Sequence, residues 1–112
     1  MIRMTDIKKS YDKANLVLRG VSLEVADGEL LSIIGASGSG KSTLLNVIGG
    51  LDRTYAGTAE VLGKDLRKLN DRQISEYRNQ SVGFIFQSFH LLNHLTCGQN
   101  VALPAYFNKK LT

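Results

Sequence analysis

Apolar and polar positions alternate in the first quarter of the chain, and the alternation then gives way to a continuous apolar run. Residues 2–7 alternate imperfectly and predict a first strand. Residues 21–25 carry an apolar side chain at every second position, which predicts a clearer strand with one buried face. Asp27-Gly28 then predicts a tight turn. The run Leu30–Ile34 is typical of a strand buried on both faces.

The middle of the chain predicts a helix, a strand and a second helix. The first helix starts near Lys41 and ends at the glycines of residues 49–50, which stop a helix well. Residues 57–62 predict a short strand. The second helix starts after Asn70, because Asn is a good N-cap and Gln73, three residues on, completes a capping box.

The last third predicts one more strand and one more helix. Residues 82–86 form an apolar run that predicts another buried strand. Thr96 and Gln99 form a second capping box, and the helix they begin should end or kink at Pro104. An antiparallel layer leading into a buried central strand and a helix predicts an α/β fold.

The junction between that central strand and its helix carries the strongest chemical motif. Four residues separate a first glycine from Gly-Lys-Ser, which is the pattern of a phosphate-binding loop. The segment reads Gly35-Ala36-Ser37-Gly38-Ser39-Gly40-Lys41-Ser42-Thr43. Its glycines let successive backbone N–H groups turn toward phosphate oxygens, and the helix N-terminus adds its dipole. Lys41 would reach the β- and γ-phosphates and Ser42 would ligate Mg²⁺, so the motif predicts a nucleoside triphosphate with magnesium.

Composition adds little to this hypothesis but excludes some alternatives. The net charge of +4 on 112 residues comes without a block of consecutive Lys or Arg, so no nucleic-acid partner is predicted. The single cysteine, Cys97, excludes an internal disulfide. No apolar run approaches the ~20 residues of a membrane span and no signal region opens the chain, so a cytoplasmic protein is expected.

With these motifs in order, the chain resembles the N-terminal half of the ATP-binding subunit of ATP-binding-cassette (ABC) transporters. The match rests on Tyr11, on the phosphate loop, on Leu51-Asp52 with Gly57-Thr58, and on Gly83-Phe84-Ile85-Phe86-Gln87. Residues 91–104 are similar to the subgroup of lipoprotein-release, macrolide-efflux and cell-division subunits. The resemblance spans residues 1–112 and implies a partial nucleotide-binding domain with a P-loop NTPase core, an N-terminal antiparallel β layer and truncation before the helical subdomain.

The resemblance also assigns roles to individual residues. Tyr11 would stack on adenine, Thr43 would add a hydroxyl near the α-phosphate, and Gln87 would ligate Mg²⁺ and hold the attacking water. The loop starting at Gln87 would face a transmembrane permease subunit, and a second ATP-binding subunit would complete a dimer on the cytoplasmic face of the cell membrane. The candidate catalytic residues are Lys41 and Gln87, and the candidate metal ligands are Ser42 and Gln87. The candidate ATP-binding residues are Tyr11, Gly35, Ser37, Gly38, Ser39, Gly40, Lys41, Ser42 and Thr43.

Two features that the family needs for hydrolysis are absent from the sequence. No apolar strand ends in Asp-Glu, and the Leu-Ser-Gly-Gly-Gln signature does not occur. Hydrolysis that powers transport is therefore expected of a full-length dimer, and the alternative is a non-catalytic nucleotide-binding fragment or remnant. Two further alternatives remain. A small-molecule kinase is disfavoured by the presence of Tyr11 and Gln87, and a DNA-repair ABC ATPase is disfavoured by the lack of a coiled-coil insertion.

Overall fold

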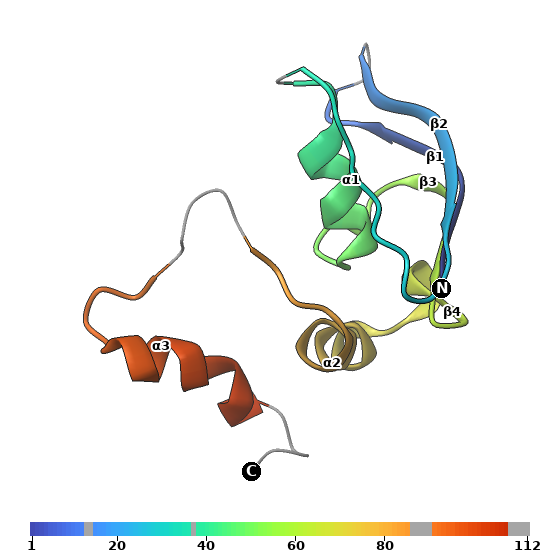
Figure 1. Ribbon diagram of the computed structural model, residues 1–112. Coiled ribbons are helices and arrows are strands. Elements are labelled where there is room, and N and C mark those ends of the chain that lie inside the picture. The colour runs from blue at the N-terminus through green and yellow to red at the C-terminus, as the bar shows by residue number, and fades with distance from the viewer. Residues whose placement is uncertain (13–14, 37, 86–90, 108–112) are drawn as a thin grey trace.

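The computed structural model describes residues 1–12, 15–36, 38–85 and 91–107, and an antiparallel sheet forms its centre (Figure 1). The strands are β1 (Ile2–Ser10), β2 (Leu16–Val25), β3 (Ala56–Val61) and the short β4 (Lys64–Asp65). Their order across the sheet is β2-β1-β3-β4, and each neighbouring pair is antiparallel. This confirms the predicted antiparallel layer and both N-terminal strands.

A bulge in β1 explains why its alternation is imperfect. Between Met4 and Ile7 the strand carries one more residue than β2 does, and the ladder to β3 shifts at the same place. Asp6 takes the extra position with φ 51°. Because the extra residue inverts the alternation, Met4 before it and Ile7 and Lys9 after it all point to the buried face.

Gly57 in β3 accommodates this bulge. Its φ is +93°, and a Cβ atom there would lie 2.3 Å from the Asp6 carbonyl oxygen and 2.6 Å from that of Thr5. Only glycine allows β3 to pass this close to the bulged backbone.

The described residues also form three α-helices, and both predicted capping boxes are confirmed. They are α1 (Lys41–Ile48), α2 (Asp71–Ser81) and α3 (Cys97–Ala102). At α2, the Asn70 side chain accepts a hydrogen bond from the Gln73 backbone N–H, and the Gln73 side chain accepts one from the Asn70 backbone N–H. Thr96 and Gln99 make the same pair of hydrogen bonds at α3. The α-helix ends at Ala102 and continues as a 3-10 turn, η2 (Leu103–Phe107), which contains Pro104, as the proline predicts. A second 3-10 turn, η1 (Leu66–Lys68), precedes α2.

The core lies between one face of the sheet and the helices α1 and α2. Its buried apolar side chains are Met4, Ile7, Leu18, Leu44, Val47, Tyr55, Ala59, Val61, Leu66, Ile74 and Tyr77. Helix α2 also closes the C-terminal end of α1: the Tyr77 hydroxyl donates to the Ile48 carbonyl at 2.7 Å and the Arg78 guanidinium to the Gly50 carbonyl at 3.1 Å. Burial raises the pKa of Tyr77 to about 12.

The two predicted buried strands are wrong for this structure. Residues 30–34 form no strand, and Leu30 and Ile34 are 94% and 93% exposed. Residues 82–85 form no strand either, Ile85 is fully exposed, and Phe86 lies outside the described residues. A strand buried on both faces needs a hydrogen-bonded neighbour on each side, and the described part of the chain places none beside these two segments.

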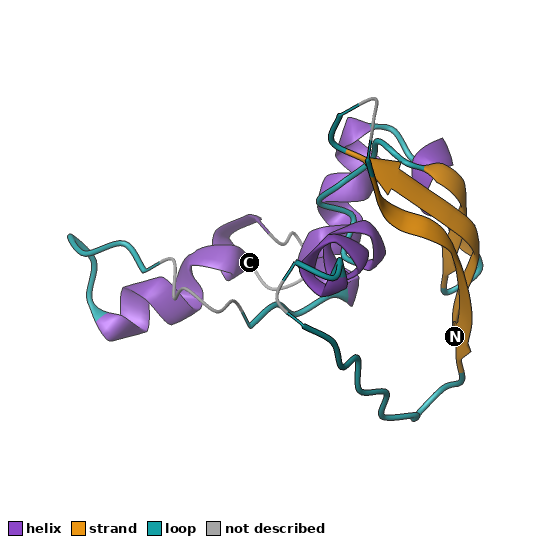
Figure 2. Ribbon diagram, turned by 90° about the horizontal axis from the view of Figure 1, so that it is seen from above, coloured by secondary structure: helices purple, strands orange, loops and turns teal. Residues whose placement is uncertain are grey.

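Residues 91–107 lie apart from the sheet in both ribbon views (Figures 1 and 2). The Asn79 side-chain amide joins them to α2 by donating to the Pro104 carbonyl at 2.8 Å. Among the described residues, no helix is both long and apolar enough to cross a membrane.

Candidate functional site

The phosphate-loop motif lies directly before α1, at the end of the chain segment that leaves β2 (Figure 1). Gly40 occupies the N-cap position with φ +97°, and Gly38 has φ +80°. The Ser39 N–H donates to the Ala36 carbonyl at 3.1 Å and closes a turn. Positive φ values at the start of a helix turn backbone N–H groups toward one concave side, which suits an anion.

Gly40 also packs closely against strand β2. A Cβ atom there would lie 3.0 Å from the Leu18 Cδ2 atom and 3.1 Å from the Val17 carbonyl oxygen. The loop therefore rests directly on β2, and its last turn can approach that strand only as glycine.

The Lys41 ammonium folds back over the loop. It donates to the Ala36 carbonyl at 2.8 Å and also to the Gly35 carbonyl. Lys41 is the first residue of α1, so its positive charge lies with the unpaired amides of the helix N-terminus. This donor set of backbone amides and one ammonium fits phosphate oxygens.

Tyr11 lies beside the loop, although 30 positions separate it from Lys41 in the sequence numbering. Its hydroxyl lies 3.2 Å from the Thr43 Oγ1 atom, and the residue is 65% exposed. A pocket of about 590 Å³ is lined by Tyr11, Val17, Gly38, Gly40, Lys41, Ser42 and Thr43. This volume is within the ~300–1,000 Å³ range of small-molecule sites.

The structure thus brings six of the candidate residues together at one pocket. Gly35 and Ser39 do not line it, but they shape the loop through the Lys41 and Ala36 contacts. Ser37 and Gln87 lie outside the described residues. The described ranges also contain no group of three His, Cys, Asp or Glu side chains that could hold a metal ion, so Ser42 is the candidate Mg²⁺ ligand that the described residues offer.

Lys9 is a residue that the sequence analysis did not single out. Its ammonium lies 5.0 Å from the centroid of the Tyr11 ring and 3.1 Å from the Asp52 Oδ1 atom. The sequence held a signal for it, because Lys9 stands two positions after Ile7 and two before Tyr11 and therefore shares their face of the strand.

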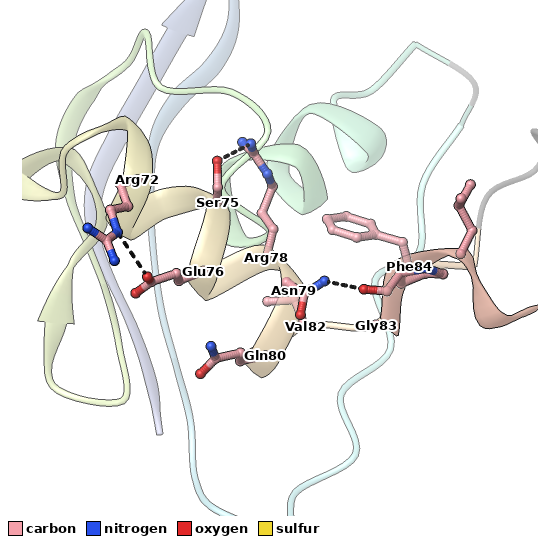
Figure 3. Close-up of a pocket in the computed structure, with 11 residues that line it drawn as sticks. Arg72, Ser75, Glu76, Arg78, Asn79, Gln80, Val82, Gly83 and Phe84 are labelled. Carbon is pink, nitrogen blue, oxygen red and sulfur yellow. Dashed lines mark hydrogen bonds and ion pairs between the residues drawn. The ribbon is translucent and has the colours of Figure 1, made fainter. Parts of the chain in front are cut away.

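A larger cavity of about 930 Å³ lies beside α2 (Figure 3). Residues of α2, the segment Val82–Phe84, Leu103 and Pro104 line it. Figure 3 shows Glu76 and Asn79 among its polar side chains, with Glu76 paired to Arg72 at 3.4 Å. None of the candidate nucleotide residues that the structure describes lines this cavity, and the two pockets share no described lining residue.

Known proteins of one family match most of this chain. The sequence model of the ABC transporter family matches residues 18–112. The macrolide export ATP-binding/permease protein MacB of Escherichia coli (strain K12) is 46% identical over an alignment of 110 residues, and the match covers 96% of this chain and 17% of MacB. MacB of Shigella sonnei (strain Ss046) matches with the same identity and coverage. The chain therefore spans about a sixth of the length of these curated relatives.

Solved structures match as well. The dimeric ATP-binding cassette MJ0796, bound to ADP and Pi after hydrolysis, is similar at a TM-score of 0.88 and 37% identity, over 96% of this chain and 47% of the cassette. A second dimeric structure of MJ0796 gives the same TM-score at 38% identity. The α/β fold class is thereby confirmed. The family model covers most of the length of this chain, and the fold of the chain matches about half of a solved cassette. The chain therefore belongs to the ABC transporter family, as the N-terminal portion of an ATP-binding domain.

Proposed function

We propose that residues 1–112 form a partial nucleotide-binding domain that binds Mg-ATP in the pocket between Tyr11 and the phosphate loop. The observation that carries this proposal is that a strand-end aromatic ring and the start of α1 line the same pocket. A nucleotide site has two parts: an aromatic ring that contacts the base, and backbone amides with an ammonium group that contact the phosphates.

Each part of the pocket has a distinct task in this proposal. Lys41 exchanges its two carbonyl acceptors for β- and γ-phosphate oxygens. Ser42, which is exposed at the pocket, holds the magnesium ion, and that ion neutralises phosphate charge. Thr43 contributes its hydroxyl near the α-phosphate, and Tyr11 stacks on adenine.

We further propose that hydrolysis belongs to the full-length protein acting as a dimer. MJ0796 is described as a dimer bound to ADP and Pi, and MacB is named as an ATP-binding and permease protein in one. By analogy, the segment at Gln87 supplies a magnesium ligand and a contact with the attacking water, and it faces a transmembrane permease. The domain would then be peripheral on the cytoplasmic face of the membrane.

The phosphate-loop assignment is tested with Lys41→Ala and the matched control Lys68→Ala, which removes the same charge from an exposed position in η1. Charge-assisted hydrogen bonds contribute about 1.5–3 kcal/mol each. The loss of even one such bond in Lys41→Ala should therefore weaken Mg-ATP by at least about twelvefold in isothermal titration calorimetry, while Lys68→Ala binds normally. An unchanged affinity of Lys41→Ala would sink the assignment.

A second candidate, nucleotide binding without turnover, is favoured by one observation. Among the described residues that line the pocket, none carries a carboxylate that could act as a base for water. Measuring Mg-ATP affinity and phosphate release on the same sample separates the two functions. Binding with no phosphate release supports the non-catalytic alternative for this chain, whereas steady release by the chain alone contradicts it.

A further inference from the structure

Lys9 is an unusual residue for a small sheet, because its side chain is only 7% exposed. The neighbouring Lys8 behaves as a surface lysine: its side chain is 51% exposed and lies 3.8 Å from the Asp6 carboxylate. Lysine is almost never buried unless its charge is paired. The bulge at Asp6 is the cause, since it turns Lys9 and not Lys8 to the buried face.

Two oxygens fix the Lys9 ammonium in this position. It donates to the Asp52 Oδ1 atom at 3.1 Å and to the Thr54 carbonyl at 2.6 Å. The same Asp52 oxygen accepts from the Thr54 N–H at 2.9 Å, so the turn between α1 and β3 holds the carboxylate in place. The ammonium is thus bound to a rigid part of the fold and has little freedom to follow a ligand.

The Tyr11 ring is held at two points by this arrangement. The Lys9 ammonium lies over the ring at 5.0 Å from its centroid, within the range of a cation–π contact. The phenol hydroxyl is tied to Thr43 of α1 at 3.2 Å. Tyr11 nevertheless remains 65% exposed and lines the pocket, which leaves room for a base to stack on it.

We propose that Lys9, anchored by Asp52, is a positioning residue that holds the Tyr11 ring ready to stack on the base of the nucleotide. The inference rests on the proposed function, because it needs Tyr11 to contact a base. Lys9 lies outside the pocket lining and does not touch phosphate in this assignment. Its effect should therefore appear with ligands that carry a base and vanish with ligands that do not.

The test compares Mg-ATP with magnesium tripolyphosphate, which has the phosphates but no base, by isothermal titration calorimetry. Lys9→Met keeps the length of the side chain and removes its charge. It should weaken Mg-ATP by about three- to fivefold and leave tripolyphosphate unchanged, because an exposed cation–π contact has about that strength. Lys9→Arg keeps a cation over the ring and should bind ATP within about twofold of the unaltered chain. Lys8→Met is the control and should alter neither affinity.

A double-mutant cycle separates positioning from general support of the fold. In a Tyr11→Ala background, Lys9→Met should have no further effect on ATP affinity, because no ring remains to be positioned. Because Lys9→Met leaves the partly buried Asp52 carboxylate without its ion-pair partner, Lys9→Met combined with Asp52→Asn is made as a second variant that removes the orphaned charge. It should show the same selective loss for ATP.

Two results would overturn the inference while leaving the proposed function intact: equal losses for ATP and tripolyphosphate, or additive losses in the cycle. If the unaltered chain binds neither ligand, the proposed function fails and the inference fails with it.

Discussion

The close passage of Gly57 beside the β1 bulge makes a quantitative prediction about stability. In Gly57→Ala, the new Cβ atom meets two backbone carbonyl oxygens at 2.3 and 2.6 Å, and neither belongs to a side chain that can rotate away. A positive φ costs an alanine about 1–2 kcal/mol. Overpacking that moves backbone costs about 1–3 kcal/mol more. We therefore expect the free energy of unfolding to fall by about 2–5 kcal/mol.

Two other glycines separate these contributions. Gly63 has φ +78° and open space around its Cβ position, so Gly63→Ala measures the backbone strain alone, about 1–2 kcal/mol. Gly98 lies in α3 with an ordinary φ and open space, so Gly98→Ala should be neutral or stabilising by up to about 1 kcal/mol.

Urea unfolding followed by far-ultraviolet circular dichroism measures all three variants on one scale. The expected order of stability is Gly98→Ala, then Gly63→Ala, then Gly57→Ala. If Gly57→Ala loses no more stability than Gly63→Ala, the close approach of β3 to the bulge does not exist in solution, and the account of how Lys9 comes to face inward fails with it.

Three further predictions concern the pocket, a helix cap and the buried phenols. Tyr11→Ala should weaken Mg-ATP by about 1 kcal/mol, roughly fivefold, but leave tripolyphosphate binding unchanged in calorimetry; an equal loss for both ligands would contradict base stacking. Asn70→Ala should lower the free energy of unfolding by about 1 kcal/mol in urea, because the Gln73 N–H loses its acceptor, and an unchanged midpoint would refute the cap. Burial raises the pKa of Tyr55 and of Tyr77 to about 12, so the unfolded chain loses these protons first and stability should fall as the pH rises from about 10 toward 12. Phenolate absorbance of the folded chain should include a phase near pH 12, and the absence of that phase would count against the burial of these two phenols.

The features that the sequence predicted correctly are those with a local cause. The caps at Asn70 and Thr96 each depend on a partner three residues away, so the sequence contains the whole interaction. The start of α1 follows from Gly40, and its end follows from the glycines at 49 and 50. The glycine-rich turn before α1 is equally local, and its binding of phosphate stays a prediction.

The wrong predictions concern pairing between distant segments. The apolar runs at 30–34 and 82–86 have the composition of buried strands, but a strand exists only where another strand supplies hydrogen bonds. No pattern within either run can state whether that neighbour is present. Lys9 was missed for a related reason: its inward position depends on the bulge at Asp6, and the bulge depends on contacts with β2 and with Gly57 of β3.

The bulge also determines which kinds of sequence change the first strand can tolerate. Deleting Asp6 would remove the bulge and keep Ile7 and Lys9 on the buried face with Met4. Deleting Lys8, which lies outside the bulge, would instead turn Lys9 and Tyr11 to the opposite face, away from α1. Adding two residues would keep the faces but carry the ring about 7 Å along the strand, beyond reach of Thr43. Between Ile7 and Tyr11 the number of residues is therefore more tightly constrained than the identity of the exposed ones, so insertions and deletions there should cost nucleotide binding more often than substitutions do.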